Sequence, residues 1–574
     1  MDTLKSYLQE NQYIIPSYSL YGGLSGFQDY GILGFRMKQK ILSCWRNMFL
    51  SENDIFEIET PIIAPYETLK ASGHVDRFTD YVVYDSKKNS HRADHLVEEW
   101  LSKNNKEEVL KQIDKNDPKA LEQIINKFNM LEEENDTLLK VQAQNLMFEI
   151  NQNFNKDKPD FLRPELATTI FVNFHHYNQF LKRDLPFGIS QIGTSFRKEI
   201  SPKQFIRMRQ FTQAEIEYFV NPNDKRHPNF EKIKNVKIPV LSDKMQSTNV
   251  DKPFVESLSF LLKNKIISNE VMAYFLGLTF LFAKKIGLDE NKIRFRQHQR
   301  NEMAHYASEC WDLEAFVNNS WLECVGCADR GDYDLKTHSK KNELIFKNRL
   351  SEPIKSTINV MNIDKKQIAM QYKQKTTKIS DRLNDLAKDV LECKKMSDEL
   401  DNNNQIVIKL GDEEILLTKN MISFQRKEEL KEFDEFYPHT IEPSFGIDRL
   451  MLSVFEHNIW RRKEDNQRIV FSVPYIICPF EIALVTLYNR DDMCKLYDEL
   501  ILELKKSDIT YYTDTSNVSI GKKYARLDEM GIKFTVTIDT ESPKDNKVTI
   551  RERDSMKQIR IMANVKDLKE HLSF

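Results

Sequence analysis

The sequence is short of the features that mark secreted, disulfide-stapled and membrane-spanning proteins. It has 7 cysteines in 574 residues, an odd number and widely spread, which argues for a reducing compartment. No apolar run approaches the ~20 residues that a membrane span needs. The first residues, Met1–Lys5, contain neither a signal-peptide core nor an Arg-rich transit pattern. We therefore expect a cytoplasmic protein that makes no use of a membrane.

Metal-binding cysteine clusters and a bulk electrostatic field are also lacking. Cys324 and Cys327 form the one tight cysteine pair, and a structural zinc ion would require a second pair or nearby histidines at ligand spacing. Cys310 is the only other candidate and lies in an apolar segment, so no zinc is expected. The net charge of −3 gives no general attraction to nucleic acid, and such a partner would have to be bound by local basic patches.

The sequence offers no Gly-rich phosphate loop, but it contains three blocks of charged and aromatic residues. They lie at 196–199, 207–215 and 442–449. Arginine forks phosphate oxygens with two parallel hydrogen bonds, a carboxylate accepts from an exocyclic amine, and a phenyl ring stacks under a base. The residue types needed are present as Arg197, Glu199, Phe211 and Arg449. The blocks together can therefore form a site for ATP.

In combination these blocks resemble motifs 2 and 3 of the class II aminoacyl-tRNA synthetases, and in detail the glycyl-tRNA synthetases of the eukaryotic and archaeal type. Further matching segments lie at 21–27, 71–76, 92–95, 163–165, 321–330 and 519–526. Taken singly, each residue would more often belong to a surface ion pair or the core, whereas several blocks in the right order are far more specific. The resemblance implies an α+β fold: an antiparallel sheet core flanked by helices, with insertions, and a C-terminal α/β anticodon-binding domain.

A chain of this length should hold several domains, since single cores stop growing beyond ~250–300 residues. We expect catalytic core at 1–77 with motif 1, 146–220 with motif 2, 291–330, and 436–467 with motif 3. Insertions are expected at 78–145 with a helical part, at 221–290, and at 331–435, whose lysines would meet either tRNA or solvent. The strand–helix alternation over 468–574 predicts a parallel-type sheet and resembles the anticodon-binding domain.

Local patterns within these segments predict particular elements. Apolar residues at helical spacing over 32–50 lead into an alternating strand at 55–61, and this pair resembles motif 1. A homodimer through residues about 30–62 is therefore expected. Motif 2 predicts two antiparallel strands joined by the loop 200–206. An apolar helical stretch is expected near 255–287, and the third insertion should be helical near 377–402 and strand-like at 406–408 and 415–417.

The resemblance also implies roles for individual residues. The ATP-binding set is Arg197, Lys198, Glu199, Arg207, Arg209, Gln210, Phe211, Glu323, Cys324 and Arg449, with Arg197 and Arg449 as the catalytic pair. Glu323 would carry Mg²⁺. The glycine-binding set is Glu165, Glu215, Glu442 and Ser444. Carboxylates that converge on one small site repel each other, and a bound ammonium relieves that repulsion.

The implied activity is that of a glycine–tRNA ligase, which uses ATP, Mg²⁺, glycine and tRNA(Gly). Lys522, Lys523 and Arg526, on one expected helix, are candidate tRNA contacts. Two alternatives are another class IIa synthetase and a non-catalytic nucleic-acid-binding relative, and the second would be expected to lose the ATP-binding arginines. Three positions depart from the family pattern: Thr168, Gln210 and Asp448.

Overall fold

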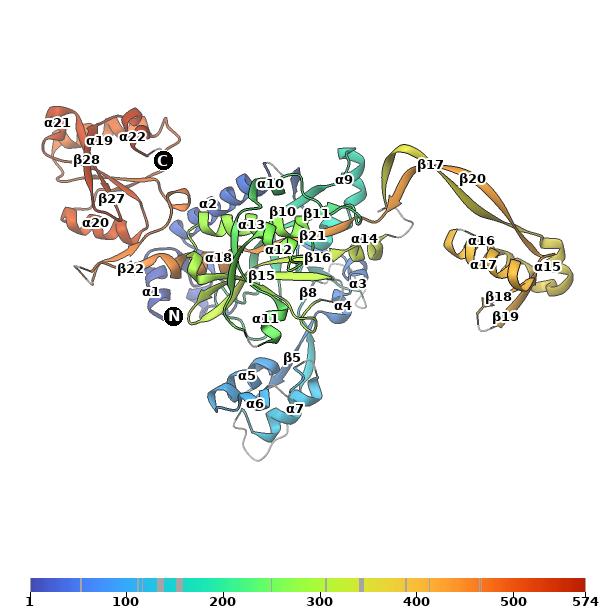
Figure 1. Cartoon of the computed structure of the whole chain (residues 1–574). Helices are drawn as coiled ribbons and strands as arrows, with labels where there is room; N and C mark the ends of the chain where they lie inside the picture. Colours follow the sequence, from blue (N-terminus) through green and yellow to red (C-terminus); the bar gives the residue numbers. More distant parts are fainter. Residues whose placement is uncertain are drawn as a thin grey trace. The chain divides into compact units, whose positions relative to one another are not determined.

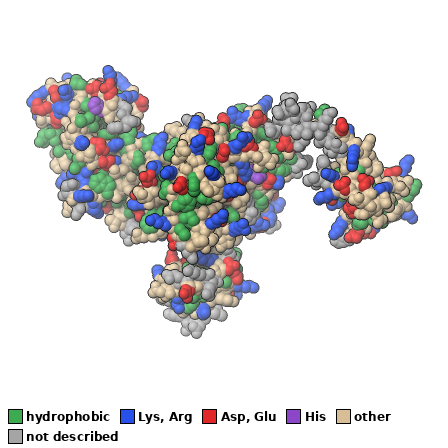
Figure 2. Space-filling model, viewed as in Figure 1, with side chains coloured by type: hydrophobic (Ala, Val, Ile, Leu, Met, Phe, Trp, Pro, Cys, Tyr) green, Lys and Arg blue, Asp and Glu red, His purple; other side chains and the backbone are tan. Residues whose placement is uncertain are grey.

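The computed structural model forms two compact units, residues 1–344 with 437–574 and residues 345–436 (Figure 1). The described residues are 2–51, 54–110, 113–115, 117–131, 139–150, 158–248, 250–304, 307–339, 345–387, 390–411, 413–463, 465 and 467–572. Lys, Arg, Asp and Glu side chains are interspersed over the face shown in Figure 2, in keeping with the small net charge. None of the described helices combines the length and apolar character that a membrane crossing needs.

A nine-stranded sheet forms the centre of the first unit, in the order β13-β12-β14-β15-β16-β21-β11-β10-β3. Its strands are β3 (Ile55–Ile58), β10 (Phe187–Phe196), β11 (Gln210–Val220), β12 (Lys237–Leu241), β13 (Phe254–Ser257), β14 (Ile293–Gln297), β15 (Glu309–Val317), β16 (Ser320–Gly331) and β21 (His439–Gly446). Neighbouring strands are antiparallel except for the pairs β10–β3 and β12–β14, which are parallel. The predicted antiparallel core and the two motif 2 strands, β10 and β11, are confirmed.

Long helices pack against this sheet: α2 (Ile32–Phe49), α13 (Glu270–Lys285) and α18 (Ile447–Asn458). Asn269 caps α13 by accepting a hydrogen bond from the backbone N–H of Met272. Most of the side chains of α13 are buried, as expected of a helix that is apolar around most of its circumference. The predicted helix over 32–50 is confirmed, and the apolar stretch near 255–287 forms α12 (Leu258–Lys263) and α13.

The two faces of the sheet differ in chemistry because successive strand residues point to opposite sides. Phe445 of β21 packs edge-to-face on Trp45 of α2 and on Phe282 of α13, with ring centroids 5.8 Å apart in both pairs. Its strand neighbour Ser444 must therefore point to the other face. That second face, called the polar face below, carries the side chains of the candidate site.

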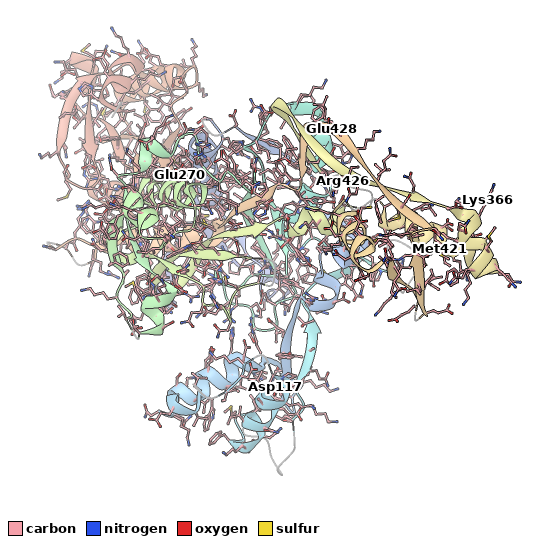
Figure 3. The ribbon with its side chains drawn as sticks, turned by 45° about the vertical axis from the view of Figure 1, so that its right-hand side comes forward. Asp117, Glu270, Lys366, Met421, Arg426 and Glu428 are labelled. Atoms are coloured by element: carbon pink, nitrogen blue, oxygen red, sulfur yellow. The ribbon has the colours of Figure 1, made fainter. Side chains whose placement is uncertain are left out.

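A small sheet with three helices occupies the chain between motifs 1 and 2. Its strands are β5 (Thr79–Tyr84), β6 (Ser90–Arg92) and β7 (Gln142–Asn145), in the order β6-β5-β7, and its helices are α5 (Ala93–Lys103), α6 (Glu107–Leu110) and α7 (Pro118–Lys127). Asp117 caps α7 by accepting from the backbone N–H of Lys119 (Figure 3). The helices were predicted, whereas the flanking strands were not.

The C-terminal part has its own five-stranded sheet and core, in the order β25-β24-β26-β27-β28. The elements are β24 (Ile482–Thr486), α19 (Asp491–Leu504), β25 (Tyr511–Asp514), α20 (Ile520–Glu529), β26 (Phe534–Ile538), β27 (Lys547–Glu552), β28 (Gln558–Met562) and α22 (Val565–Leu572). β24 runs parallel to β25 and β26, as predicted. β27 and β28 are antiparallel, so the expectation of a parallel-type sheet is wrong for these two strands.

The second unit consists of a long strand pair and a small α/β cluster. β17 (Phe346–Ile363) pairs antiparallel with β20 (Ile422–Phe436), and Arg426 and Glu428 lie along β20 (Figure 3). Between Ile363 and Met421 the chain forms the cluster, which consists of α15 (Lys365–Tyr372), α16 (Thr376–Leu386), α17 (Val390–Asn403), β18 (Gln405–Leu410) and β19 (Glu413–Thr418). The predicted helical stretch and the two short strands are confirmed. The long pair was not predicted.

Candidate active site

A pocket lies on the polar face, where β16, β21 and β11 are neighbours. Eight of the sequence-predicted residues line it: Arg197, Glu199, Arg207, Phe211, Glu323, Cys324, Ser444 and Arg449. Cross-strand register places Asp312, Gly326, Ser444 and Glu215 in one row over β15, β16, β21 and β11. The sheet thus joins blocks that are far apart in the sequence.

Arg197 and Phe211 lie side by side at the end of the motif 2 hairpin. The guanidinium carbon of Arg197 is 5.3 Å from the centre of the Phe211 ring, within range of a cation–π contact. Arg197 also donates a hydrogen bond from Nε to the carbonyl of Pro164, 3.3 Å away. Among the described residues its two terminal nitrogens have no hydrogen-bond partner, so they can bind a ligand with paired oxygens.

Arg449 connects three segments of the site from the first turn of α18. Its Nε donates to the carbonyl of Ile206 at 2.9 Å, and its Nη1 donates to the backbone carbonyl of Glu323 at 2.9 Å and lies 3.3 Å from the Glu323 carboxylate. A Cβ on Gly446 would stand only 3.3 Å from the carbonyl oxygen of Cys324. The glycine of Gly-x-x-Arg therefore allows the close approach of β21 to β16 that brings Arg449 to the pocket.

Glu199 and Arg207 line the same pocket from the loop side. Glu199 is only 9% exposed. A guanidinium nitrogen of Arg207 contacts the ring of His95, which belongs to the matching segment 92–95. The inserted domain therefore contributes a side chain that positions a pocket residue, a role that the sequence did not indicate.

Lys198, Arg209 and Gln210 were predicted to bind ATP but do not line the pocket. Arg209 donates hydrogen bonds to the carbonyls of Glu199, at 3.2 Å, and Ser25, at 3.3 Å. Gln210 lines a neighbouring hollow instead. Phe211 and Thr212 line both the pocket and this hollow, so Gln210 lies next to residues of the pocket without lining it.

Glu215 is buried and held by four hydrogen bonds. Its Oε2 accepts from the backbone N–H groups of Leu166 and Ala167, each at 2.9 Å. Its Oε1 accepts from the hydroxyl of Ser444 at 2.8 Å and from the amide of Gln213 at 2.7 Å. Burial raises the pKa of Glu215 and the nearby Glu165 adds to the rise, while these donors oppose it.

Glu442 accepts a buried hydrogen bond from Arg330, an arginine to which the sequence analysis assigned no role. Arg330 donates from Nη1 to Glu442 at 2.9 Å, and it also forks Asp334. Burial raises the pKa of Glu442 to about 8, although Arg330 opposes the rise. Arg330 is the last residue of the matching segment 321–330, so the sequence could indicate this arginine but not its partner.

Glu165 has partners of its own at the edge of this carboxylate cluster. Its carboxylate lies 3.3 Å from Nε2 of His74 and accepts from the hydroxyl of Thr168 at 2.7 Å. Burial raises its pKa, but His74, Arg330 and Thr168 outweigh burial and hold it below the ordinary value. Thr168, which departs from the family pattern, thus still supplies a hydrogen bond to Glu165.

Glu217 is a fourth carboxylate that sequence reasoning missed. It is fully buried, it lies within 4.8 Å of the Glu215 and Glu442 carboxylates, and neither of its oxygens has a hydrogen-bond partner among the described residues. Burial, followed by Glu442, raises its pKa well above the ordinary value. The period of two along a strand was the available signal, because it places residue 217 on the same face as Glu215.

The three basic residues predicted to contact tRNA differ in exposure. Lys522 and Arg526 are exposed on α20, and Arg526 pairs with Asp514 at 2.9 Å. Lys523 is only 2% exposed, and its ammonium donates to the carbonyls of Thr486 and Asp514, at 3.1 and 3.2 Å. The expectation that Lys523 belongs to a surface patch is therefore wrong, since burial and two internal acceptors remove its charge from the surface.

Comparison with known proteins gives the same family across almost the whole chain. The description "tRNA synthetase class II core domain (G, H, P, S and T)" matches residues 150–458, and "Anticodon binding domain" matches 481–572. Glycine--tRNA ligase 1, mitochondrial, of Saccharomyces cerevisiae is 38% identical over 97% of this chain and 88% of its own length. Glycine--tRNA ligase of Methanocaldococcus jannaschii is 37% identical over 98% and 97%.

A eukaryotic and an archaeal relative are therefore each more than one third identical to this chain over most of both sequences. The matched core covers the nine-stranded sheet from β10 to β21 and all three blocks of pocket residues. The matched C-terminal domain begins one residue before β24. The chain belongs to the glycine–tRNA ligase family of the class II aminoacyl-tRNA synthetases.

Proposed function

We propose that this chain activates glycine with ATP to glycyl-adenylate and transfers the glycyl group to the 3′ end of tRNA(Gly). The observation that carries the proposal is the cluster of buried carboxylates on the polar face, directly beside a pocket that presents Arg197, Phe211 and Arg449. The negative charge of the cluster suits a small ammonium group. The neighbouring pocket suits a nucleoside triphosphate.

The roles proposed for the ATP half of the site are those that the resemblance to the family implies. Arg197 forks the α-phosphate and the glycine carboxylate, which brings the attacking oxygen and the phosphorus together as pyrophosphate leaves. Phe211 stacks on one face of adenine and Arg449 covers the other and reaches the γ-phosphate. Glu199 accepts from the adenine amine, and Arg207 brackets the phosphates. No general base is assigned, because positioning and charge stabilisation account for the step.

Mg²⁺ fits the same pocket through Glu323. This carboxylate is about half exposed there, with a side-chain exposure of 53%, and Mg²⁺ is usually held by one or two carboxylates together with substrate phosphates. Bound in that way, the ion would neutralise charge on the phosphate oxygens. The arginines would still align the two reacting groups.

Glycine selection follows from the fixed positions of the carboxylates. The donors on Glu215 and the Arg330 pair on Glu442 hold both groups in place, so that the ammonium meets a rigid acceptor set with Glu165 at its edge. Discrimination against alanine is then steric, since an added methyl group in a closed, packed site costs about 1–3 kcal/mol.

Recognition of tRNA is proposed for the C-terminal domain, with Lys522 and Arg526 as phosphate contacts. Such contacts add affinity but no sequence information, which requires donors and acceptors on base edges of an unstacked loop. Lys523 is not among the proposed tRNA contacts, because its side chain is buried. A reducing, cytoplasmic location is also proposed, supported by the small number of cysteines and their wide spread along the sequence.

A two-fold symmetric dimer through residues about 30–62 completes the proposal. Supporting it, β3 is the edge strand of the central sheet, and large apolar side chains are exposed within this range: Ile32 at 65%, Phe35 at 56%, Phe56 at 36% and Ile62 at 44%. A stable, active monomer in light scattering at micromolar concentration would contradict this part. Phe35→Glu should convert a dimer to monomers, with Phe180→Glu, an exposed residue outside this range, as control.

Amino-acid-dependent ATP–pyrophosphate exchange tests the central claim. Across the twenty amino acids, glycine alone should drive exchange. Comparable exchange with alanine, serine or proline would identify a different class IIa specificity. No exchange with any amino acid, from a folded chain that binds tRNA, would favour the non-catalytic alternative.

A further inference from the structure

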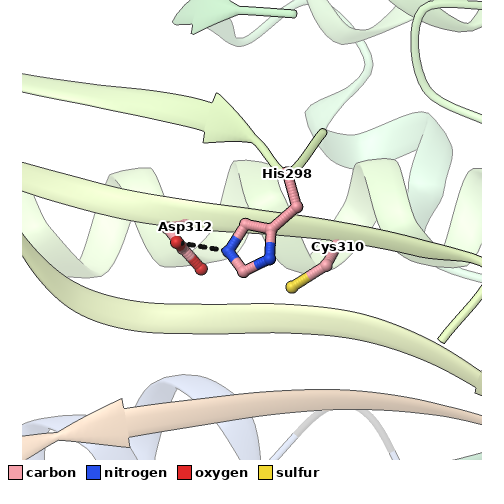
Figure 4. Close-up of side chains that lie close together, drawn as sticks. All are labelled: His298, Cys310 and Asp312. Atoms are coloured by element: carbon pink, nitrogen blue, oxygen red, sulfur yellow. Dashed lines mark hydrogen bonds and ion pairs between the residues drawn. The ribbon is translucent and has the colours of Figure 1, made fainter. Parts of the chain in front are cut away.

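His298, Cys310 and Asp312 gather on the polar face at the side of the pocket (Figure 4). One ligand-type atom from each lies within 4.8 Å of the others. His298 directly follows β14, and its backbone N–H donates to the carbonyl of Cys310 at 3.0 Å. Cys310 and Asp312 are alternate residues of β15 and therefore point to the same side. The group is thus held by two neighbouring strands of a rigid sheet.

The hydrogen bonds of His298 leave one ring nitrogen ready to bind a metal ion. Nε2 donates to Asp312 at 2.6 Å, so the neutral imidazole carries its lone pair on Nδ1. Nδ1 is buried and has no hydrogen-bond partner among the described residues. In Figure 4 the Cys310 thiol lies on the side of the ring that bears this nitrogen. A carboxylate that fixes a histidine from behind is the usual second partner of a metal-binding imidazole.

The surroundings favour Asp312 as that orienting group and leave the site accessible. A guanidinium nitrogen of Arg296 lies 3.9 Å from the Asp312 carboxylate and balances its charge. The His298 side chain is 22% exposed, and Cys310 is half-buried and free. A tetrahedral zinc centre would bring thiolate and imidazole nitrogen about 3.5 Å apart, a closure that small side-chain rotations can supply.

The Cys324–Cys327 pair does not form a comparable group. The thiol of Cys324 lies 3.4 Å from the hydroxyl of Ser453 in α18. Cys327 is fully buried on β16, on the face of the sheet that packs against α13. Cys310 pairs across the strands with Ala328, whereas Cys327 pairs with Trp311, so the thiols of Cys310 and Cys327 point to opposite faces. The histidine that the sequence spacing lacked comes instead from the end of β14.

We propose that Cys310 Sγ and His298 Nδ1, with Asp312 orienting the imidazole, bind a soft divalent cation of the Zn²⁺ class beside the pocket. A thiolate and an imidazole are ligands that select zinc over magnesium, and water fills the remaining positions. Asp312 adjoins the pocket wall, since its Oδ1 is 3.7 Å from where a Cβ of Gly326 would stand. The site goes beyond the proposed ligase activity and does not depend on it.

Cobalt titration of the full chain tests this site directly. Co²⁺ bound to a thiolate gives a sulfur-to-cobalt charge-transfer absorption, and we expect one such ion per chain. Cys310→Ser should abolish the band, His298→Ala should weaken Co²⁺ binding at least tenfold, and Asp312→Asn should weaken it about 10–100-fold. Zn²⁺ should displace the bound cobalt, whereas excess Mg²⁺ should not.

Cys494→Ser is the matched control, because Cys494 is also half-buried and free but lies in α19. It should leave the cobalt band unchanged. The thermal midpoint of each metal-free variant shows whether it is folded. A folded wild-type chain without the band, or a Cys310→Ser variant that binds Co²⁺ with wild-type affinity and absorption, would overturn the assignment.

Discussion

The carboxylate of Asp448 accepts a hydrogen bond from the backbone N–H of Thr212, 2.7 Å away. The contact ties the start of α18 to β11, so it joins the third block of site residues to the second. The hydroxyl of Tyr30 donates to the other oxygen of Asp448, and the Lys38 ammonium lies 3.7 Å away. This departure from the family pattern is thus a structural connection between segments that carry all three motifs.

Asp448→Ala should therefore reduce stability and weaken ATP use together. It leaves the partly buried Thr212 amide without its acceptor, at a cost of about 1–3 kcal/mol in the free energy of unfolding. Arg449 follows directly and should lose alignment, which raises KM for ATP. Denaturant unfolding and exchange kinetics measure both effects. Asp498→Ala, at an exposed position of α19, is the control, and equal stability of the two variants would contradict the role of Asp448.

Arg197→Ala should lower glycine-dependent exchange by about 10²–10³-fold, the usual loss when one preorganised donor to developing charge is removed. Arg197→Lys should recover little of it, since a point charge cannot fork two oxygens. Arg226→Ala, which removes an exposed arginine paired with Asp224, should leave exchange unchanged. Near-normal exchange by Arg197→Ala at an unchanged melting temperature would show that ATP binds elsewhere.

Glycine binding should release a proton from Glu442 at neutral pH. With a pKa of about 8, this carboxyl is mostly protonated at pH 7, and the ammonium must displace that proton. Glycine affinity should rise roughly tenfold per pH unit below the pKa and level off above it. Calorimetry in buffers of different ionisation enthalpy measures the release. Glu442→Gln should bind weakly and without the slope, whereas a wild-type affinity that does not change between pH 6 and 8 would rule the coupling out.

Glu217→Gln should stabilise the fold, increasingly so as pH rises. The folded-state pKa of Glu217 lies well above its unfolded value, so its contribution is fully present below about pH 4.5 and is lost as pH rises toward the folded value. Through Glu217 each pH unit in that window costs the wild type about 1.4 kcal/mol of stability, so the advantage of the variant should grow by about that amount per pH unit. Unfolding curves at pH 5, 6 and 7 test this, with the exposed Glu499→Gln as control. A constant difference would mean that Glu217 is already ionised and partnered.

Much of the fold could be predicted because buried strands and helices leave a period in the sequence. The β10–β11 hairpin and α2 carry that pattern, and the ordered blocks brought most of the pocket together. The β17–β20 pair could not be predicted, since residues such as Arg426 and Glu428 are exposed and no apolar alternation marks the strand. His298 and Arg330 have no local signal for their partners, which come from neighbouring strands.

Lys522 and Lys523, adjacent on α20, should behave oppositely when neutralised. Ile520, Lys523 and Leu527 share one helix face by their spacing, and that face packs inward. The burial of Lys523 could therefore be predicted from the sequence. Lys523→Ala should lower the melting temperature, because it removes the donor to two buried carbonyls, at a cost of about 1–3 kcal/mol. Its tRNA KM should change no more than that of other destabilised variants.

Lys522→Ala should leave the melting temperature unchanged and raise the KM for tRNA. It should also reduce the slope of log affinity against log salt by about 0.7–0.9, without changing anticodon preference. Aminoacylation at several salt concentrations, together with thermal unfolding, separates the two residues. A wild-type KM and salt slope for Lys522→Ala would mean that this lysine is simply solvated on the helix surface.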